Sequence, residues 1–170
     1  MFCFKCWHAP QWRERALEVN LYRTGPWEQS LKKLLNCLQI KNLHFRGHVA
    51  NVRNIWEENH LLVRPSRSEG LSLALVEAMW CGRPAVVTNI DGNAEVCVDG
   101  KTGFVAAAPE VKLLEETLER AWNSRTDRQR VGLAARARAE QLIPKDPLGD
   151  FCGQMVACAE KQKMEIGKQK

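Results

Sequence analysis

Two glutamates and a glycine give residues 64–84 their chemical character. The sequence there reads RPSRSEGLSLALVEAMWCGRP, with Glu69 and Glu77 eight positions apart and Gly70 directly after the first. Because Gly70 has no side chain, its backbone can come close to a ligand. The N–H groups of residues 70–73 open a predicted helix and lack intrahelical partners. Together with the positive end of the helix dipole, they favour an anion such as a phosphate or a diphosphate.

The two carboxylates need partners other than phosphate, since they cannot donate hydrogen bonds, and the hydroxyls of a sugar would serve. Eight helical residues rise about 12 Å, so Glu69 and Glu77 lie too far apart to share one proton. We therefore predict one elongated ligand, with a sugar at Glu69, phosphates at the helix start and a ribose-like sugar at Glu77. On spacing alone, an alternative stays open in which Glu69 is an N-terminal helix acid and Glu77 a surface residue.

Strand-like and helix-like segments alternate along the chain. Short apolar runs bounded by turn residues predict strands, and apolar residues three or four apart predict helices. The predicted strands are 16–22, 43–46, 60–63, 85–88 and 103–105, and the predicted helices are 27–38, 52–58, 71–80, 93–96, 109–123 and 127–142. This alternation favours parallel pairing through right-handed crossovers. The predicted fold class is α/β, an open Rossmann-like, doubly wound and mostly parallel sheet that binds ligands at the carboxyl ends of its strands.

Composition narrows the range of partners. The 170 residues suit one domain, and no stretch approaches the roughly 20 apolar residues of a membrane span. The N-terminus shows no signal peptide, so we expect a cytoplasmic protein. A net charge of +5 fits an anionic small ligand, and no stripe of basic and aromatic residues points to nucleic acid. Seven irregularly spaced cysteines, Cys3 and Cys6 among them, favour free thiols over a metal site.

The stretch 66–104 resembles the donor-binding half of retaining glycosyltransferases of the GT-B fold, in particular family 4, the glycosyl transferases group 1. The family pattern runs P-S-x-x-E-G, then E-A-M-x-x-G-x-P-V-V, then G-G/N-x-E-x-V-x-D-G-x-x-G. The matching residues are Pro65, Ser66, Glu69, Gly70, Glu77, Ala78, Met79, Gly82, Pro84, Val86, Val87, Gly92, Asn93, Glu95, Val98, Asp99, Gly100, Gly103 and Phe104. Upstream, residues 22–26 resemble the G-x-G-P turn and residues 45–49 the F-x-G-x-V strand end.

The resemblance implies a role for each matching residue. Glu69 would be the catalytic residue and contact the transferred sugar, and Glu77 would hold the nucleotide ribose. The amides of Gly70, Leu71 and Ser72 would meet the donor phosphates. The other expected donor-binding residues are Ser66, Gly25, and, beside the nucleobase, His48 and Val49. Family members transfer a hexose from a nucleotide diphosphate sugar to an acceptor hydroxyl with retention of the anomeric configuration, so we expect that donor and neither a cofactor nor a metal.

The resemblance also sets the expected domain limits. We predict a donor-binding domain at 11–143 that lacks its first strand, an unmatched segment at 1–10 and a partly frayed tail at 144–170. Full members carry an N-terminal acceptor domain, so we expect an enzyme that is incomplete without that domain or a partner chain. The alternative is a non-catalytic nucleotide-sugar-binding or interaction module. Two residues depart from the pattern, since Arg23 replaces the first glycine of the G-x-G-P turn and Asp91 stands where the family has glycine.

Overall fold

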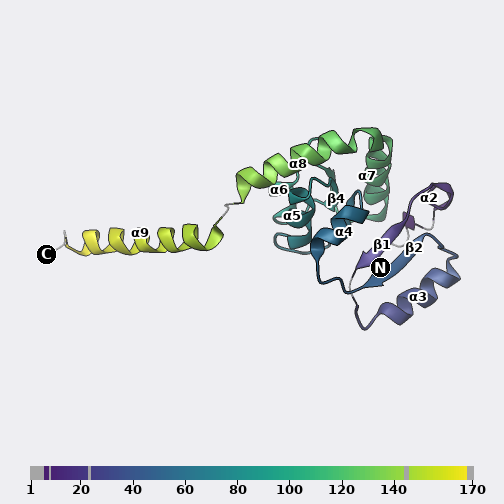
Figure 1. The fold of residues 1–170 in the computed structure, drawn as a ribbon, viewed down its shortest axis with the longest axis horizontal. Coiled ribbons are helices and arrows are strands. Elements are labelled where there is room, and N and C mark those ends of the chain that lie inside the picture. Colours follow the sequence, from purple (N-terminus) through teal and green to yellow (C-terminus); the bar gives the residue numbers. More distant parts are fainter. Residues whose placement is uncertain (1–5, 8, 23, 144–145, 168–170) are drawn as a thin grey trace.

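Strands and helices alternate in the computed structural model, which describes residues 6–7, 9–22, 24–143 and 146–167 (Figure 1). The strands are β1 (Val19–Tyr22), β2 (Leu43–Gly47), β3 (Leu62–Arg64), β4 (Ala85–Thr88) and β5 (Phe104–Ala106). The helices are α2 (Pro10–Glu14), α3 (Glu28–Cys37), α4 (Val52–Glu58), α5 (Leu73–Trp80), α6 (Asn93–Val96), α7 (Val111–Asn123), the 3-10 helix η1 (Arg125–Asp127), α8 (Arg128–Leu142) and α9 (Pro147–Gly167). The predicted α/β alternation is confirmed.

All strand pairs are parallel, as predicted, but the described strands form two sheets where the sequence predicts one. Strand β1 pairs with β2, and the second sheet has the order β3-β4-β5. Side-chain hydrogen bonds link β1 to the end of α4, just before β3. Asn20 on β1 donates to the side chain of Asn59 at 2.9 Å, and Asn59 donates to the Tyr22 hydroxyl at 2.7 Å.

Strand β4 lies at the centre of the second sheet and is buried along its whole length. Its side chains alternate between two cores, as the pleat of a strand requires. Val86 packs in one cluster with Leu114 and Leu118 of α7. Ala85 and Val87 belong to a second cluster that contains residues of α5 and α8. Helices therefore cover both faces of this sheet, which explains why β4 reads as a continuous apolar run.

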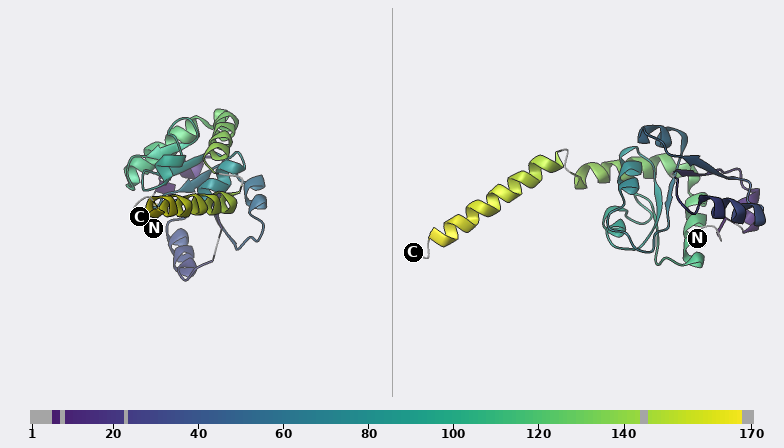
Figure 2. Two further views of the ribbon diagram at one scale, coloured as in Figure 1. Left: turned by 90° about the vertical axis from the view of Figure 1, so that its left-hand side faces the viewer. Right: turned by 90° about the horizontal axis from the view of Figure 1, so that it is seen from below.

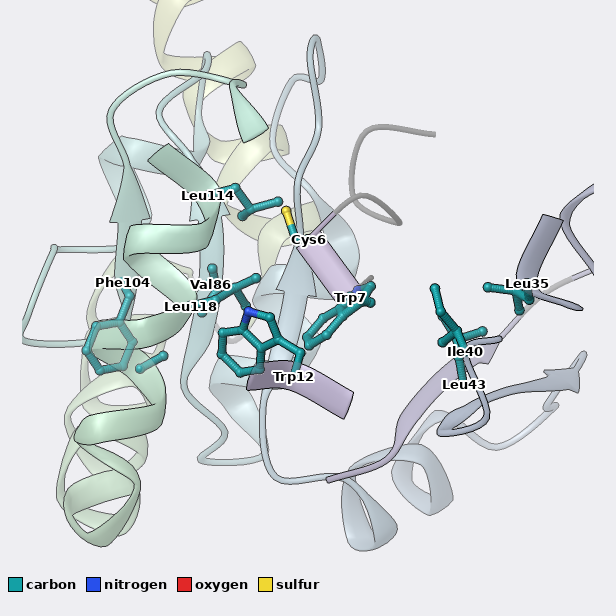
Figure 3. Packing of buried hydrophobic residues seen from close by; sticks show 11 residues of the cluster. Cys6, Trp7, Trp12, Leu35, Ile40, Leu43, Val86, Phe104, Leu114 and Leu118 are labelled. Carbon is teal, nitrogen blue, oxygen red and sulfur yellow. The ribbon is translucent and has the colours of Figure 1, made fainter. Parts of the chain in front are cut away.

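Two described residues of the segment 1–10, Cys6 and Trp7, belong to the core, although this segment matches no family motif. Cys6, Trp7 and Trp12 are buried, and they lie between residues of the two sheets and α7 (Figure 3). The ring centroids of Trp7 and Trp12 are 5.4 Å apart in an edge-to-face contact. The guanidinium of Arg15 stacks 4.2 Å from the centre of the Trp12 ring. Family motifs do not reveal this burial, because none of these residues belongs to a motif.

The C-terminal segment forms a 21-residue helix, α9, where the sequence analysis predicts a partly frayed tail. The helix projects from the rest of the molecule (Figures 1 and 2), so packing does not explain it. Its residues include many with high intrinsic helix propensity, such as alanine, glutamine, glutamate and lysine. Leu148, Phe151, Met155 and Val156 are exposed on it. None of the helices in the described residues is long and apolar enough to cross a membrane.

Helix α8 approaches the end of α5 at a pair of glycines. Gly82 follows α5 with φ +66°, a conformation that side chains rarely adopt, and its N–H bonds the carbonyl of Met79. A Cβ atom built on Gly132 of α8 would overlap the carbonyl oxygen of Gly82. The two helices can therefore pack this closely only while residue 132 has no side chain.

We predict that Gly132→Ala lowers the free energy of unfolding by about 1–3 kcal/mol, because α8 must shift to make room for the methyl group. Urea unfolding followed by circular dichroism measures the change. Gly153→Ala is the matched control, since residue 153 is also a helical glycine but its Cβ would have nothing within 4 Å. Equal unfolding midpoints for Gly132→Ala and the wild type would contradict the prediction.

Candidate functional site

The loop between β3 and α5 is fixed at the carboxyl end of the three-stranded sheet. The N–H of Ser66 donates to the carbonyl of Arg64, the last residue of β3, at 3.1 Å. The hydroxyl of Thr88, the last residue of β4, donates to the carbonyl of Ser66 at 2.6 Å. Two adjacent strand ends therefore hold the loop in place, and its polar residues occupy the edge at which parallel sheets bind ligands.

A run of unpaired backbone N–H groups follows this loop. Helix α5 begins at Leu73, two residues later than predicted, and the N–H groups of Leu75 and Val76 both donate to the carbonyl of Ser72. Within the part of the chain that the structure describes, the N–H groups of residues 70–74 donate to no protein acceptor. Gly70, Leu71 and Ser72 thus contribute donors from a turn rather than from the helix itself. Five successive N–H groups at the positive end of a helix dipole form a seat for an anion.

Glu69 precedes this run, and its side chain has well-defined partners. Arg64 donates from Nε to Oε2 at 2.9 Å and from Nη2 to Oε1 at 2.6 Å. The Ser66 hydroxyl donates to Oε2 at 2.6 Å. The hydrogen bonds from Arg64 are the main cause that lowers the pKa of Glu69 from 4.5 to about 2, while partial burial acts in the opposite direction. Glu69 is therefore a carboxylate at neutral pH.

Ser72 joins Glu69 to the start of α5. Its side chain is buried, and its hydroxyl also contributes to the lowered pKa of Glu69. It forms no hydrogen bond of good geometry with any residue that the structure describes. The hydroxyl of Ser72 is therefore buried close to the carboxylate of Glu69.

The loop after β4 closes the other side of the site. Asp91 has φ +39°, in the left-handed region that favours glycine, and its Oδ2 accepts a hydrogen bond from the N–H of Glu69 at 3.2 Å. A Cβ atom on Gly92 would lie 3.4 Å from Leu71, so the two loops touch here. Asn93 is fully buried, and neither end of its side-chain amide has a partner among the described residues. The two loops therefore approach closely although residue 91 is an aspartate.

The remaining predicted residues lie apart from the Glu69 loop. Glu77 lies half-buried on α5, and its side chain makes no hydrogen bond to the described residues, so its carboxylate is available to a ligand. Gly25 and the pair His48 and Val49 follow β1 and β2, the strands of the other sheet. Gly25 and His48 are exposed, and Val49 is half-buried. Arg23 lies outside the described residues, as does Cys3.

Arg64 is the residue of this site that motif matching misses. No pattern contains it, yet it forms the ion pair with Glu69. The available signal is local, because a charged residue ends an otherwise apolar strand, LLVR, five positions before Glu69.

A hollow of about 380 Å³ lies away from the candidate site, around Phe104, Arg120 and Arg130. At the candidate site the side chains of Leu71 and Leu73 are exposed instead. No group of three or more His, Cys, Asp or Glu side chains among the described residues is arranged to hold a metal ion. The polar groups that the described residues bring together at the site are backbone donors and carboxylates.

The sequence matches the family model of the glycosyl transferases group 1 over residues 10–138. It is 28% identical over 102 residues to the capsular polysaccharide biosynthesis glycosyltransferase CapM of Staphylococcus aureus, with 60% of this chain and 27% of CapM covered. It is 35% identical over 106 residues to an uncharacterized glycosyltransferase of Methanocaldococcus jannaschii, with 59% and 30% covered. The chain therefore spans less than a third of the length of these curated relatives.

Solved structures show the same fold at low sequence identity. HepE of Anabaena, solved in complex with UDP-glucose, matches with a TM-score of 0.76 and 19% identity over 92% of this chain and 44% of HepE. The C-terminal domain of a group 1 glycosyl transferase of Francisella tularensis matches with a TM-score of 0.71 and 14% identity over 83% and 77%. This chain therefore belongs to the glycosyl transferases group 1 family, and its fold is that of a C-terminal GT-B domain.

Proposed function

We propose that this chain is the donor-binding domain of a retaining hexosyltransferase that transfers a hexose from a nucleotide diphosphate sugar to an acceptor hydroxyl. The observation that carries the proposal is the run of unpaired N–H groups at residues 70–74, flanked by Glu69 and Glu77. A diphosphate fits the run of donors, and the two carboxylates suit the hydroxyls of the groups on either side. The seven residues between the glutamates match the spacing in family 4.

The N–H groups would act mainly on the leaving group. As the bond between the sugar and the diphosphate breaks, negative charge builds on the diphosphate oxygens. Donors fixed in advance stabilise that charge without reorganising, and each is typically worth about 3 kcal/mol. Glu69 would accept hydroxyls of the transferred sugar, and Glu77 those of the ribose. Gly25, His48 and Val49 would lie toward the nucleotide, with the nucleobase beside the last two.

The rest of the enzyme would supply the acceptor. Leu71 and Leu73 are exposed beside the site, which suits a face that a second domain or a partner chain covers. We therefore propose that transfer needs such an acceptor-binding partner. The structure of HepE with UDP-glucose supports a UDP-sugar as the first donor to test. We place the domain in the cytoplasm, because no disulfide joins the described cysteines, in keeping with a reducing compartment.

Calorimetric titration of the 170-residue chain tests the donor-binding function. We expect saturable 1:1 binding of a nucleotide diphosphate sugar from a panel of UDP-glucose, GDP-mannose and ADP-glucose. A chain that binds none of these sugars or their parent nucleotides would contradict the proposal and favour an interaction module.

We predict that Glu77→Ala weakens the nucleotide and the nucleotide sugar equally, because both carry the ribose. Loss of hydrogen bonds to a charged group costs about 1.5–3 kcal/mol, which corresponds to a roughly 10- to 100-fold weaker affinity. Glu116→Ala is the matched control, since Glu116 is an exposed helical carboxylate on α7. A Glu77→Ala protein with wild-type affinity for the nucleotide would overturn the assignment to the ribose.

We predict that Glu69→Ala weakens the nucleotide sugar but leaves the affinity for the nucleotide alone within about twofold of the wild type. The reason is that only the sugar-bearing ligand carries hydroxyls for Glu69. Titrations with UDP and with UDP-glucose, side by side, measure the difference. Equal losses for both ligands would show that Glu69 serves the nucleotide and not the sugar.

A further inference from the structure

We propose that Arg64 is a positioning residue that holds the carboxylate of Glu69 in the orientation in which it meets the transferred sugar. The inference rests on the proposed function, because it assigns Arg64 a role within the proposed donor site. The family motifs do not include this arginine.

The geometry of the pair fixes rotation as well as position. Arg64 contacts both oxygens of Glu69, with Nε on Oε2 at 2.9 Å and Nη2 on Oε1 at 2.6 Å. Two parallel hydrogen bonds from the planar guanidinium define the plane of the carboxylate, which a single bond leaves free to turn. With the Ser66 hydroxyl also on Oε2, three of about four acceptor positions are filled. A ligand hydroxyl therefore meets a carboxylate whose direction is set beforehand.

Both partners are anchored to the sheet. Arg64 is the last residue of β3 and pairs in register with Val87 of the buried strand β4. The N–H of Glu69 donates to Asp91, which follows β4. The Glu69 side chain, although it belongs to a loop, is thus held in place by residues at the ends of two strands.

A purely structural role does not account for the pair. The side chains of Arg64 and Glu69 are 45% and 21% exposed. Ion pairs at such exposure contribute about 0–1 kcal/mol to stability, so the fold has little need of this one. A variant without the pair is therefore expected to fold, which makes the functional role testable.

The charges around Glu69 decide how it titrates. The groups that face it are the guanidinium of Arg64, the hydroxyls of Ser66 and Ser72, and the carboxylate of Asp91, which accepts its N–H; Arg67 is the nearest other cation in sequence. Arg64 is the largest cause of the lowered pKa of Glu69. Because the folded pKa of about 2 lies below the ordinary 4.5, Glu69 stays ionised as the pH falls past 4.5. Without Arg64 the carboxylate takes up its proton closer to pH 4.5.

The experiment compares Arg64→Leu, Arg64→Lys and Arg120→Leu in the full chain. Arg120 is a matched control, because it forms a bidentate pair with Asp99 at 2.9 and 3.1 Å and is similarly exposed, but its other hydrogen bond goes to Val105 of β5. Each protein is titrated with UDP and with UDP-glucose, and in parallel with GDP and GDP-mannose. The ratio of the affinity for the nucleotide sugar to that for the nucleotide alone is the sugar-dependent affinity. Carbon-13 NMR of the Glu69 carboxyl, assigned with Glu69→Gln, gives its pKa.

We expect Arg64→Leu to reduce the affinity for the nucleotide sugar about fivefold relative to the nucleotide alone, with an unchanged unfolding midpoint. The pKa of Glu69 should rise toward 4.5. Arg64→Lys should keep that pKa low but restore the sugar-dependent affinity only in part, because a lysine supplies charge without the fork. Arg120→Leu should match the wild type in both measurements.

Three outcomes would count against the inference in distinguishable ways. If the wild type binds no nucleotide or nucleotide sugar, the proposed function fails and the role of Arg64 fails with it. If the wild type binds a sugar-bearing ligand and Arg64→Leu changes neither its sugar-dependent affinity nor the pKa of Glu69, only the inference fails. An Arg64→Leu protein that binds the nucleotide sugar more tightly than the wild type would also reject the inference, since the ion pair would then obstruct the sugar.

Discussion

The candidate site depends on the position and orientation of backbone N–H groups that the fold leaves without acceptors among the described residues. The first N–H groups of any helix lack intrahelical partners, and here the preceding turn extends the run to five, at residues 70–74, which concentrates positive potential at the start of α5. Their positions are fixed because β3 and β4 end beside one another and hold the preceding loop through Thr88 and Ser66. Carboxylates next to such a seat need compensation, and Arg64 supplies it for Glu69.

The central strand β4 explains why this edge is rigid. Val86 contacts one core and Ala85 and Val87 the other, so β4 cannot shift without disturbing both. Thr88 ends β4 and Asp91 follows three positions later, and both form hydrogen bonds with the loop that carries Glu69. The two cores thus fix β4, and β4 in turn fixes the exposed loops that follow the ends of the strands.

Sequence patterns predicted the parts of this structure that depend on local periodicity. The strand at 85–88 and the helices at 52–58 and 93–96 have the predicted bounds, because apolar spacing and turn residues determine them locally. The division into two sheets was not predictable, since it depends on which strand edges meet in space.

The same distinction applies to the candidate site: motifs are readable from the sequence, but contacts that form only in the folded chain are not. Motifs located Glu69, Gly70 and Glu77, but the Arg64–Glu69 ion pair depends on the direction of two side chains after a turn. The burial of Cys6 and Trp7 was not predictable for a related reason. Trp7 enters the core through contacts with distant residues, and no local signal records them.

The tryptophan cluster also has a consequence for synthesis of the chain. Trp12 packs edge-to-face against Trp122, and Arg15 reaches Glu119 across 104 positions. Long separations of this kind slow folding, because the ends of a long loop must meet before the contact forms. The N-terminal aromatic residues therefore emerge from the ribosome early and stay without their partners until α7 has been translated. During that interval they present an apolar surface that a chaperone can bind.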